Sequence, residues 1–149
     1  MIQPSTDAIV QEIDYPHPIE LVWEAITDQD AVSEWLMKAD GLKPEVGAKF
    51  TLSEDYGEQG SITVECEVLE AEKPNRLVYT WNTPPELYTT LAINLDATDE
   101  GTHVRLEQTG FETGGERAGQ YRTGADWGWG KKFLPDSLPK VLEKLAARA

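Results

Sequence analysis

The hydrophobic pattern of the chain begins with a short alternation and then changes to a helical repeat. Apolar and polar side chains alternate over residues 9–15, which is typical of a strand that buries one face. Pro16 and Pro18 end this strand, because proline cannot donate to a sheet ladder and fixes its own φ angle. Two short amphipathic helices are then predicted, the second capped by Asp28 or Asp30. Their apolar stripes consist of Ile19, Val22, Trp23 and Ile26, and of Ala31, Val32, Trp35 and Leu36.

From Gly41 onward the hydrophobic period changes to two. Strands with alternating apolar residues are separated by short polar segments that contain Gly, Pro, Asn and Asp, as turns do. Short strands at such even spacing are typical of an antiparallel meander. One face of each strand is apolar and the other polar, so the sheet needs a cover on one side only. The predicted strands are 49–52, 61–71, 76–81, 89–97 and 102–109.

The C-terminal part of the chain is expected to supply that cover. Residues 110–119 are rich in glycine and predict a loop, and Gly128–Gly130 is expected to be a flexible loop or a mobile lid. A long helix then follows. Pro135 and Pro139 each remove a helix hydrogen bond, so we expect either a kink near them or a fresh helix start with Asp136 or Ser137 as its cap. The apolar stripe of the helix consists of Leu134, Leu138, Val141, Leu142 and Leu145.

Composition and charge narrow the class of protein. With 149 residues, 40% hydrophobic and 27% charged, the chain is typical of one globular domain spanning residues 1–149. Thirteen basic and 27 acidic residues give a net charge of −14, which repels nucleic acids and anionic membranes, so neither is expected as a partner. No segment reaches the ~20 apolar residues of a membrane span. Met1–Asp7 carries no pattern of a secretory signal, and we expect a cytoplasmic protein.

Few residues of the sequence suggest a catalytic or metal-binding role. Cys66, the only cysteine, lies in an alternating apolar run and is interpreted as a small buried hydrophobe. His17 and His103 are far apart in sequence, and no metalloprotease, nucleophile-elbow or phosphate-loop motif is present. The sequence therefore predicts no catalytic residue, no metal site and no cofactor.

Four strings of residues carry the resemblance to a known family: Tyr15–Asp28 with Trp35 seven residues further on, Glu70–Trp81, Gly101–Phe111, and Gly128–Trp129 leading into Ser137–Leu145. In this order and spacing they resemble the START-like (SRPBCC) superfamily. Within it, the chain is most similar to the group related to the C-terminal domain of Aha1, the activator of the Hsp90 ATPase. The resemblance implies an α+β helix-grip fold: a curved antiparallel sheet of about six strands around a long C-terminal helix, with two short helices after the first strand.

The same resemblance implies a cavity between the sheet and the last helix, with a small hydrophobic or aromatic molecule as its ligand. The aromatic side chains would either fill the core or line this cavity, and both interpretations are open. Gln108, Asn94, Arg122 and Tyr121 are candidates for its polar groups. The candidate cavity-lining residues are Trp35, Phe50, Tyr79, Trp81, Leu91, Gln108, Tyr121, Trp127, Trp129 and Phe133.

Two other functions are open at this point. The resemblance to the Hsp90 activator implies a protein-interaction module, with an Hsp90-type chaperone as a possible partner. Relatives in the superfamily also include polyketide cyclases, which implies a cyclase- or dehydratase-like enzyme that would use the same cavity. Acid–base catalysis by a pair of carboxylates would need at least one of them inside the cavity, and no carboxylate is predicted there.

Overall fold

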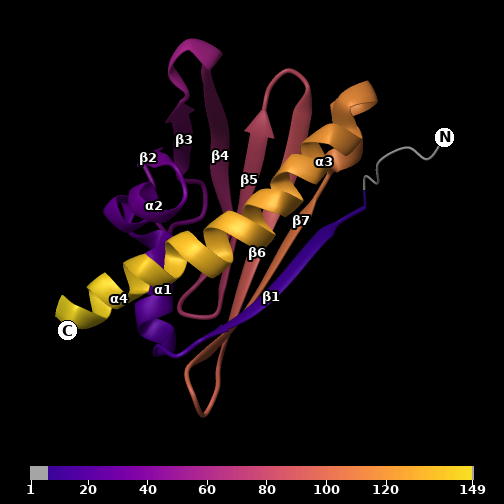
Figure 1. The fold of residues 1–149 in the computed structure, drawn as a ribbon. Coiled ribbons are helices and arrows are strands. Elements are labelled where there is room, and N and C mark those ends of the chain that lie inside the picture. Colours follow the sequence, from indigo (N-terminus) through magenta and orange to yellow (C-terminus); the bar gives the residue numbers. More distant parts are fainter. Residues whose placement is uncertain (1–6, 149) are drawn as a thin grey trace.

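The structure is a computed structural model that describes residues 7–148, and its main feature is an antiparallel sheet crossed by a long helix (Figure 1). Within these residues the sheet has seven strands, in the order β1-β7-β6-β5-β4-β3-β2. The segment Met1–Asp7, for which the sequence predicts no secretory signal, lies outside the described residues apart from Asp7. The strands are β1 (Ile9–Tyr15), β2 (Lys38–Asp40), β3 (Lys49–Asp55), β4 (Ser61–Glu72), β5 (Arg76–Thr83), β6 (Leu87–Ala97) and β7 (Thr102–Thr109).

The predicted α+β helix-grip fold is confirmed, and the sheet buries one face as expected. Strands β5, β6 and β7 place alternate apolar residues on the inner face, where Leu91 and Ile93 of β6 lie beside Gln108 and Leu106 of β7. All six strands predicted from the alternation are present. The additional strand is β2, which pairs with β3. It has three residues, too few for an alternating pattern to predict it.

Two short helices follow β1, as predicted. They are α1 (Ile19–Thr27) and α2 (Gln29–Trp35). Of the two candidate caps, Asp28 is the one used, because its carboxylate accepts a hydrogen bond from the backbone N–H of Ala31 at 3.0 Å. Trp35 ends α2 and donates from its indole nitrogen to the carbonyl oxygen of Ala25 at 2.8 Å, which ties the two helices together.

The C-terminal helix begins earlier than predicted and does not restart at the prolines. The loop predicted over residues 110–119 is wrong in part: η2 (Phe111–Arg117) contains two short 3₁₀ turns that meet at Gly115, whose φ of 61° and ψ of −133° are not helical, and α3 (Ala118–Trp127) follows. Gly128–Gly130 lies inside η3 (Gly128–Ser137), a π-helical segment that continues into α4 (Leu138–Arg148). In Figure 1 the whole helix runs diagonally across the sheet, from orange to yellow. A short 3₁₀ turn, η1 (Gly57–Gln59), joins β3 to β4.

The wider π-helical turn accommodates the two prolines. The N–H of Leu138 bonds to the carbonyl of Phe133, and Pro139 has no N–H, so neither group serves the carbonyl of Leu134. The hydroxyl of Tyr15 in β1 donates to this carbonyl at 2.6 Å within the core. The first strand therefore supplies the hydrogen bond that the second proline removes.

Candidate functional site

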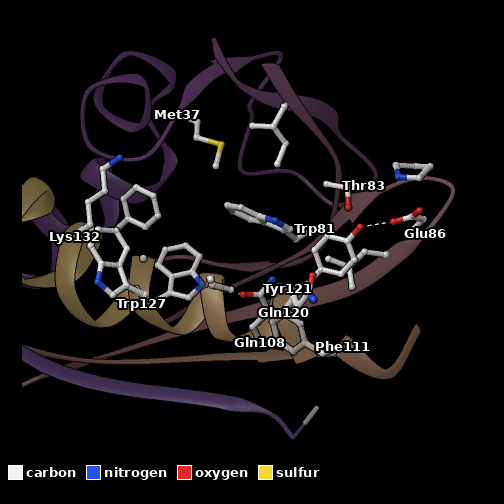
Figure 2. Close-up of a pocket in the computed structure, with 18 of the residues that line it drawn as sticks. Met37, Trp81, Thr83, Glu86, Gln108, Phe111, Gln120, Tyr121, Trp127 and Lys132 are labelled. Carbon is white, nitrogen blue, oxygen red and sulfur yellow. Dashed lines mark hydrogen bonds between the residues drawn. The ribbon is translucent and has the colours of Figure 1, made fainter. Parts of the chain in front are cut away.

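A cavity of about 650 Å³ lies between the C-terminal helix and one end of the sheet (Figure 2). Its helical wall is formed by α3 and the first part of η3. The opposite wall is formed by the ends of β5 and β6 near their connecting turn, by the end of β7, and by the start of η2. Met37, Tyr56 and Ile62 complete it. Drug-sized ligands occupy cavities of roughly 300–1,000 Å³, so this cavity can hold a small molecule.

The structure brings together six of the ten residues predicted to line a cavity. Those six span the two walls, and Trp127, 61% exposed, lies where the cavity meets solvent. They are Trp81, Gln108, Tyr121, Trp127, Trp129 and Phe133.

The other four predicted residues lie in the packed core, outside the cavity lining. Tyr79 and Leu91 pair with each other in the sheet one row further from the β5–β6 turn, and the ring of Phe50 meets that of Tyr79 edge-on at 5.1 Å. Trp35 packs behind the wall, 6.4 Å from both Trp129 and Phe133 between ring centroids. The alternation places all four on the inner face, but it does not indicate where along each strand the helix leaves a gap.

Two polar candidates also lie elsewhere. Asn94 is on the polar face of the sheet, where its side-chain oxygen accepts a hydrogen bond from Arg76 at 2.8 Å. Arg122 points to the start of β1 and donates to the carbonyls of Asp7 and Ala8 at 3.2 and 3.4 Å. Neither side chain lines the cavity.

Aromatic rings form the inner wall in a network of edge contacts. Trp129 is 2% exposed and lies 5.6 Å from Trp81 and 5.3 Å from Phe133 between ring centroids, both at steep interplanar angles. Such edge-to-face pairs are favourable because the positive ring edge meets a negative ring face. The wall is therefore rigid and apolar. Lys132 adds one cation at its rim, 5.3 Å from the centroid of the Phe133 ring.

Gln108 brings a polar group into this apolar wall. Its side-chain oxygen accepts a hydrogen bond from the indole nitrogen of Trp129 at 2.9 Å, and its nitrogen donates to the hydroxyl of Thr89 at 3.0 Å. The Thr89 hydroxyl in turn donates to the carbonyl of Trp81. This chain fixes the orientation of the amide and links both walls of the cavity.

A second polar cluster lies at the rim, where Tyr121 of α3 meets the β5–β6 turn. The Tyr121 hydroxyl donates to the carboxylate of Glu86, and that hydrogen bond raises the pKa of Tyr121 (Figure 2). Arg117 lies 3.6 Å from the same carboxylate oxygen and 5.3 Å from the centroid of the Tyr121 ring. Glu86 was not predicted, because it lies in the connection between the predicted strands 76–81 and 89–97. Its position five residues after Trp81, a predicted cavity residue, was the available signal.

Two glycines shape the cavity wall. At Gly114 a Cβ atom would lie 2.9 Å from Cδ2 of Tyr121, so the glycine lets that ring pack against the backbone. At Gly124, which lines the cavity, a Cβ atom would meet nothing within 4 Å. A side chain introduced at Gly124 would therefore occupy free space.

Three titratable side chains of the cavity lining, those of Glu86, Tyr121 and Lys132, lie at its rim. Burial raises the pKa of the Cys66 thiol to about 12, with a smaller contribution from Glu65, and Cys66 does not line the cavity. Among residues 7–148 no three His, Cys, Asp or Glu side chains are placed to hold a metal ion. Within the same range, no helix is both long and apolar enough to cross a membrane.

Comparison with known proteins identifies a family and several solved structures to which this chain is similar. The model of the family described as "Activator of Hsp90 ATPase homolog 1-like protein" matches residues 16–143. The crystal structure of MLL2253 from Mesorhizobium loti is 36% identical, with a TM-score of 0.75, and the alignment covers 95% of this chain and 98% of that one. The solution structure of BH1534 from Bacillus halodurans is 24% identical over 95% and 99% of the two chains, also with a TM-score of 0.75.

A third similar structure is that of DynU16, described as a protein in the dynemicin biosynthetic locus. It is 23% identical, with a TM-score of 0.74, and the alignment covers 92% of this chain. The chain spans about half of the length of DynU16, 47%, so this likeness concerns the fold alone. A comparison with curated proteins found no significant match.

Proposed function

The chain belongs to the activator of Hsp90 ATPase homolog 1-like family, and on that premise we propose that it binds a small, flat, apolar molecule between the C-terminal helix and the β5–β7 end of the sheet. The observation that carries the proposal is the cavity of about 650 Å³, whose wall contains the rings of Trp81, Trp129 and Phe133. A soluble fold normally fills such a space with side chains. Here the space is free, and its apolar wall favours a ligand over water.

The expected affinity follows from the surface that a ligand would bury. A two- or three-ring molecule that buries roughly 300 Å² of apolar surface gains about 7 kcal/mol before the cost of association is subtracted. The preformed wall keeps that cost low, because its rings are already ordered by their mutual contacts. A gain of about 7 kcal/mol corresponds to a Kd of roughly 10 μM, so dissociation constants of tens to hundreds of micromolar are expected once the remaining cost of association is subtracted.

A thermal-shift screen of the wild-type protein tests the proposal. The panel contains polycyclic aromatics, flavonoids, fatty acids and sterols, each at several concentrations. A ligand at about 100 times its Kd adds roughly 2.7 kcal/mol, which raises the Tm of a chain of this length by roughly 5–10 °C. A consistent shift with flat aromatic compounds supports the proposal, and the absence of a shift with every class contradicts it.

The family description supports a second candidate, a protein-interaction module that acts on an Hsp90-type chaperone. The observation in its favour is the family match over residues 16–143 together with the strongly acidic charge of −14. The test is the ATPase rate of a purified Hsp90-type chaperone with and without this protein. A rate that does not change at any concentration of the added protein contradicts this candidate.

A further inference from the structure

Gln108 is the one side chain of the cavity wall that is both polar and almost completely buried. It is 1% exposed, whereas the other buried polar side chains of the described residues, those of Thr27, Thr89 and Thr102, do not line the cavity. A polar group in an apolar wall costs free energy unless its hydrogen bonds are made. The number of hydrogen bonds that Gln108 makes therefore determines the free-energy cost of burying its amide.

The amide of Gln108 has one hydrogen without a partner. An indole nitrogen only donates, so the atom that faces Trp129 is the amide oxygen, and the amide nitrogen must face Thr89. That nitrogen carries two hydrogens, and the contact with Thr89 uses one of them. No residue between 7 and 148 accepts the second hydrogen, and Gln108 is part of the cavity wall, as Figure 2 shows.

We propose that Gln108 sets the specificity of the cavity by donating this second N–H to an acceptor oxygen on the ligand. The ligand class is then an aromatic carbonyl compound whose oxygen enters first and whose rings lie against Trp81 and Trp129. The inference rests on the proposed binding function and adds its selectivity. Trp129 and Thr89 hold the amide in place, so the donor is oriented before the ligand arrives.

The same geometry discriminates against ligands that lack an acceptor. Such a ligand expels water from the cavity and leaves the N–H of Gln108 buried without a partner. A site built to hydrogen-bond its ligand rejects an analogue without the matching group for this reason. The preference thus combines the bond gained with the carbonyl compound and the penalty incurred with its analogue.

The test uses 9-fluorenone and fluorene, which share one ring skeleton and differ by the carbonyl. Their Kd values are measured by tryptophan fluorescence for the wild type and for Gln108→Met, which keeps the length of the side chain and removes its N–H groups. The ratio of the two Kd values is compared between the proteins, because this cancels the difference in hydration of the probes. We expect the ratio to favour fluorenone roughly tenfold more in the wild type than in Gln108→Met.

The outcomes separate this inference from the function on which it rests. If neither probe binds the wild type, both are overturned. If both probes bind and the ratio is the same in the two proteins, the specificity assigned to Gln108 is wrong and the binding function stands. Should Gln108→Met fail to fold, the side-chain amide signals of Gln108 in ¹⁵N-labelled wild type decide: fluorenone must shift one of its two hydrogens more than fluorene does, and equal shifts overturn the inference.

Discussion

The hydroxyl of Tyr15 in β1 makes a hydrogen bond to the C-terminal helix, and removing it tests how much this bond stabilises the packing of the helix on the sheet. It donates at 2.6 Å to the carbonyl of Leu134, whose usual helical partners do not serve it, because Leu138 bonds to Phe133 and Pro139 has no N–H to give. Tyr15→Phe keeps the ring and removes only this hydrogen bond. The substitution therefore removes one hydrogen bond from a backbone carbonyl in the core.

The expected loss of stability in Tyr15→Phe follows from the burial of both hydrogen-bonding partners. Tyr15 is 3% exposed and Leu134 is 4% exposed, so water does not replace the lost hydroxyl without rearrangement. A buried polar group that loses its only partner costs about 1–3 kcal/mol. For a chain of this length, 2 kcal/mol lowers Tm by roughly 4–8 °C. The loss is a large part of the 5–15 kcal/mol that is typical of a folded domain.

The assay is urea unfolding followed by far-UV circular dichroism, with the slope m required to stay unchanged. Tyr121→Phe is the matched control, because it also removes one tyrosine hydroxyl but its partner, Glu86, is exposed. We expect the control to lie within about 0.5 kcal/mol of the wild type. If Tyr15→Phe lies within the same range, the hydrogen bond to Leu134 does not support the helix and the reasoning is refuted.

Three further predictions concern other contacts. Hydrogen bonds to Glu12 and Asp14 raise the pKa of His103. The contribution of His103 to the free energy of unfolding is therefore complete below the unfolded pKa of about 6.5 and is lost as pH rises through the raised folded-state pKa. His103→Gln should flatten the dependence of stability on pH in that window, measured by urea unfolding at stepped pH. Native Cys66 should resist iodoacetamide at pH 8 and react only after unfolding, as followed by mass spectrometry, because burial keeps its thiol protonated. Asp28→Ala should lower the free energy of unfolding by about 1 kcal/mol, since α2 loses its cap; no change in urea unfolding would contradict this.

Most of the sheet could be predicted from the sequence because its alternation is regular. The strand ends agreed within a few residues, and the cap of α2 followed from an aspartate at the right position. The three-residue strand β2 could not be predicted, because its pairing with β3 depends on the path of the chain after α2. The C-terminal helix was misjudged for a different reason. Glycines and prolines disfavour an ordinary α-helix, but packing on the sheet and a hydrogen bond from Tyr15 stabilise a π-helical segment instead.

The presence of a cavity between sheet and helix could be predicted from the sequence, but only some of the residues that line it could. The family resemblance indicated a cavity between sheet and helix, and the aromatic residues near Trp81 and Trp129 do line one. Tyr79 shares a face with Trp81 but lies deeper in the core, a difference of one row that no periodicity encodes. The two partners of Gln108, Thr89 and Trp129, lie on β6 and η3, 19 and 21 residues away in sequence, so its fixed amide could be identified only from the structure.

The central claim, that the cavity binds a flat apolar molecule, is tested most directly by closing it from Gly124. Gly124 lines the cavity and a Cβ atom there meets nothing within 4 Å, so a side chain can start from this position without a backbone clash. Gly124→Phe is designed to place a ring at the cavity, and Gly124→Ala is the control that adds a single methyl group. Both substitutions improve helix propensity, so loss of fold is not expected.

The measurement is the binding of N-phenyl-1-naphthylamine, a flat apolar fluorescent probe, to the wild type and both variants. We predict saturable binding by the wild type and by Gly124→Ala, and binding at least tenfold weaker by Gly124→Phe with an unchanged circular dichroism spectrum. Equal binding by all three proteins would place the probe elsewhere and contradict the account.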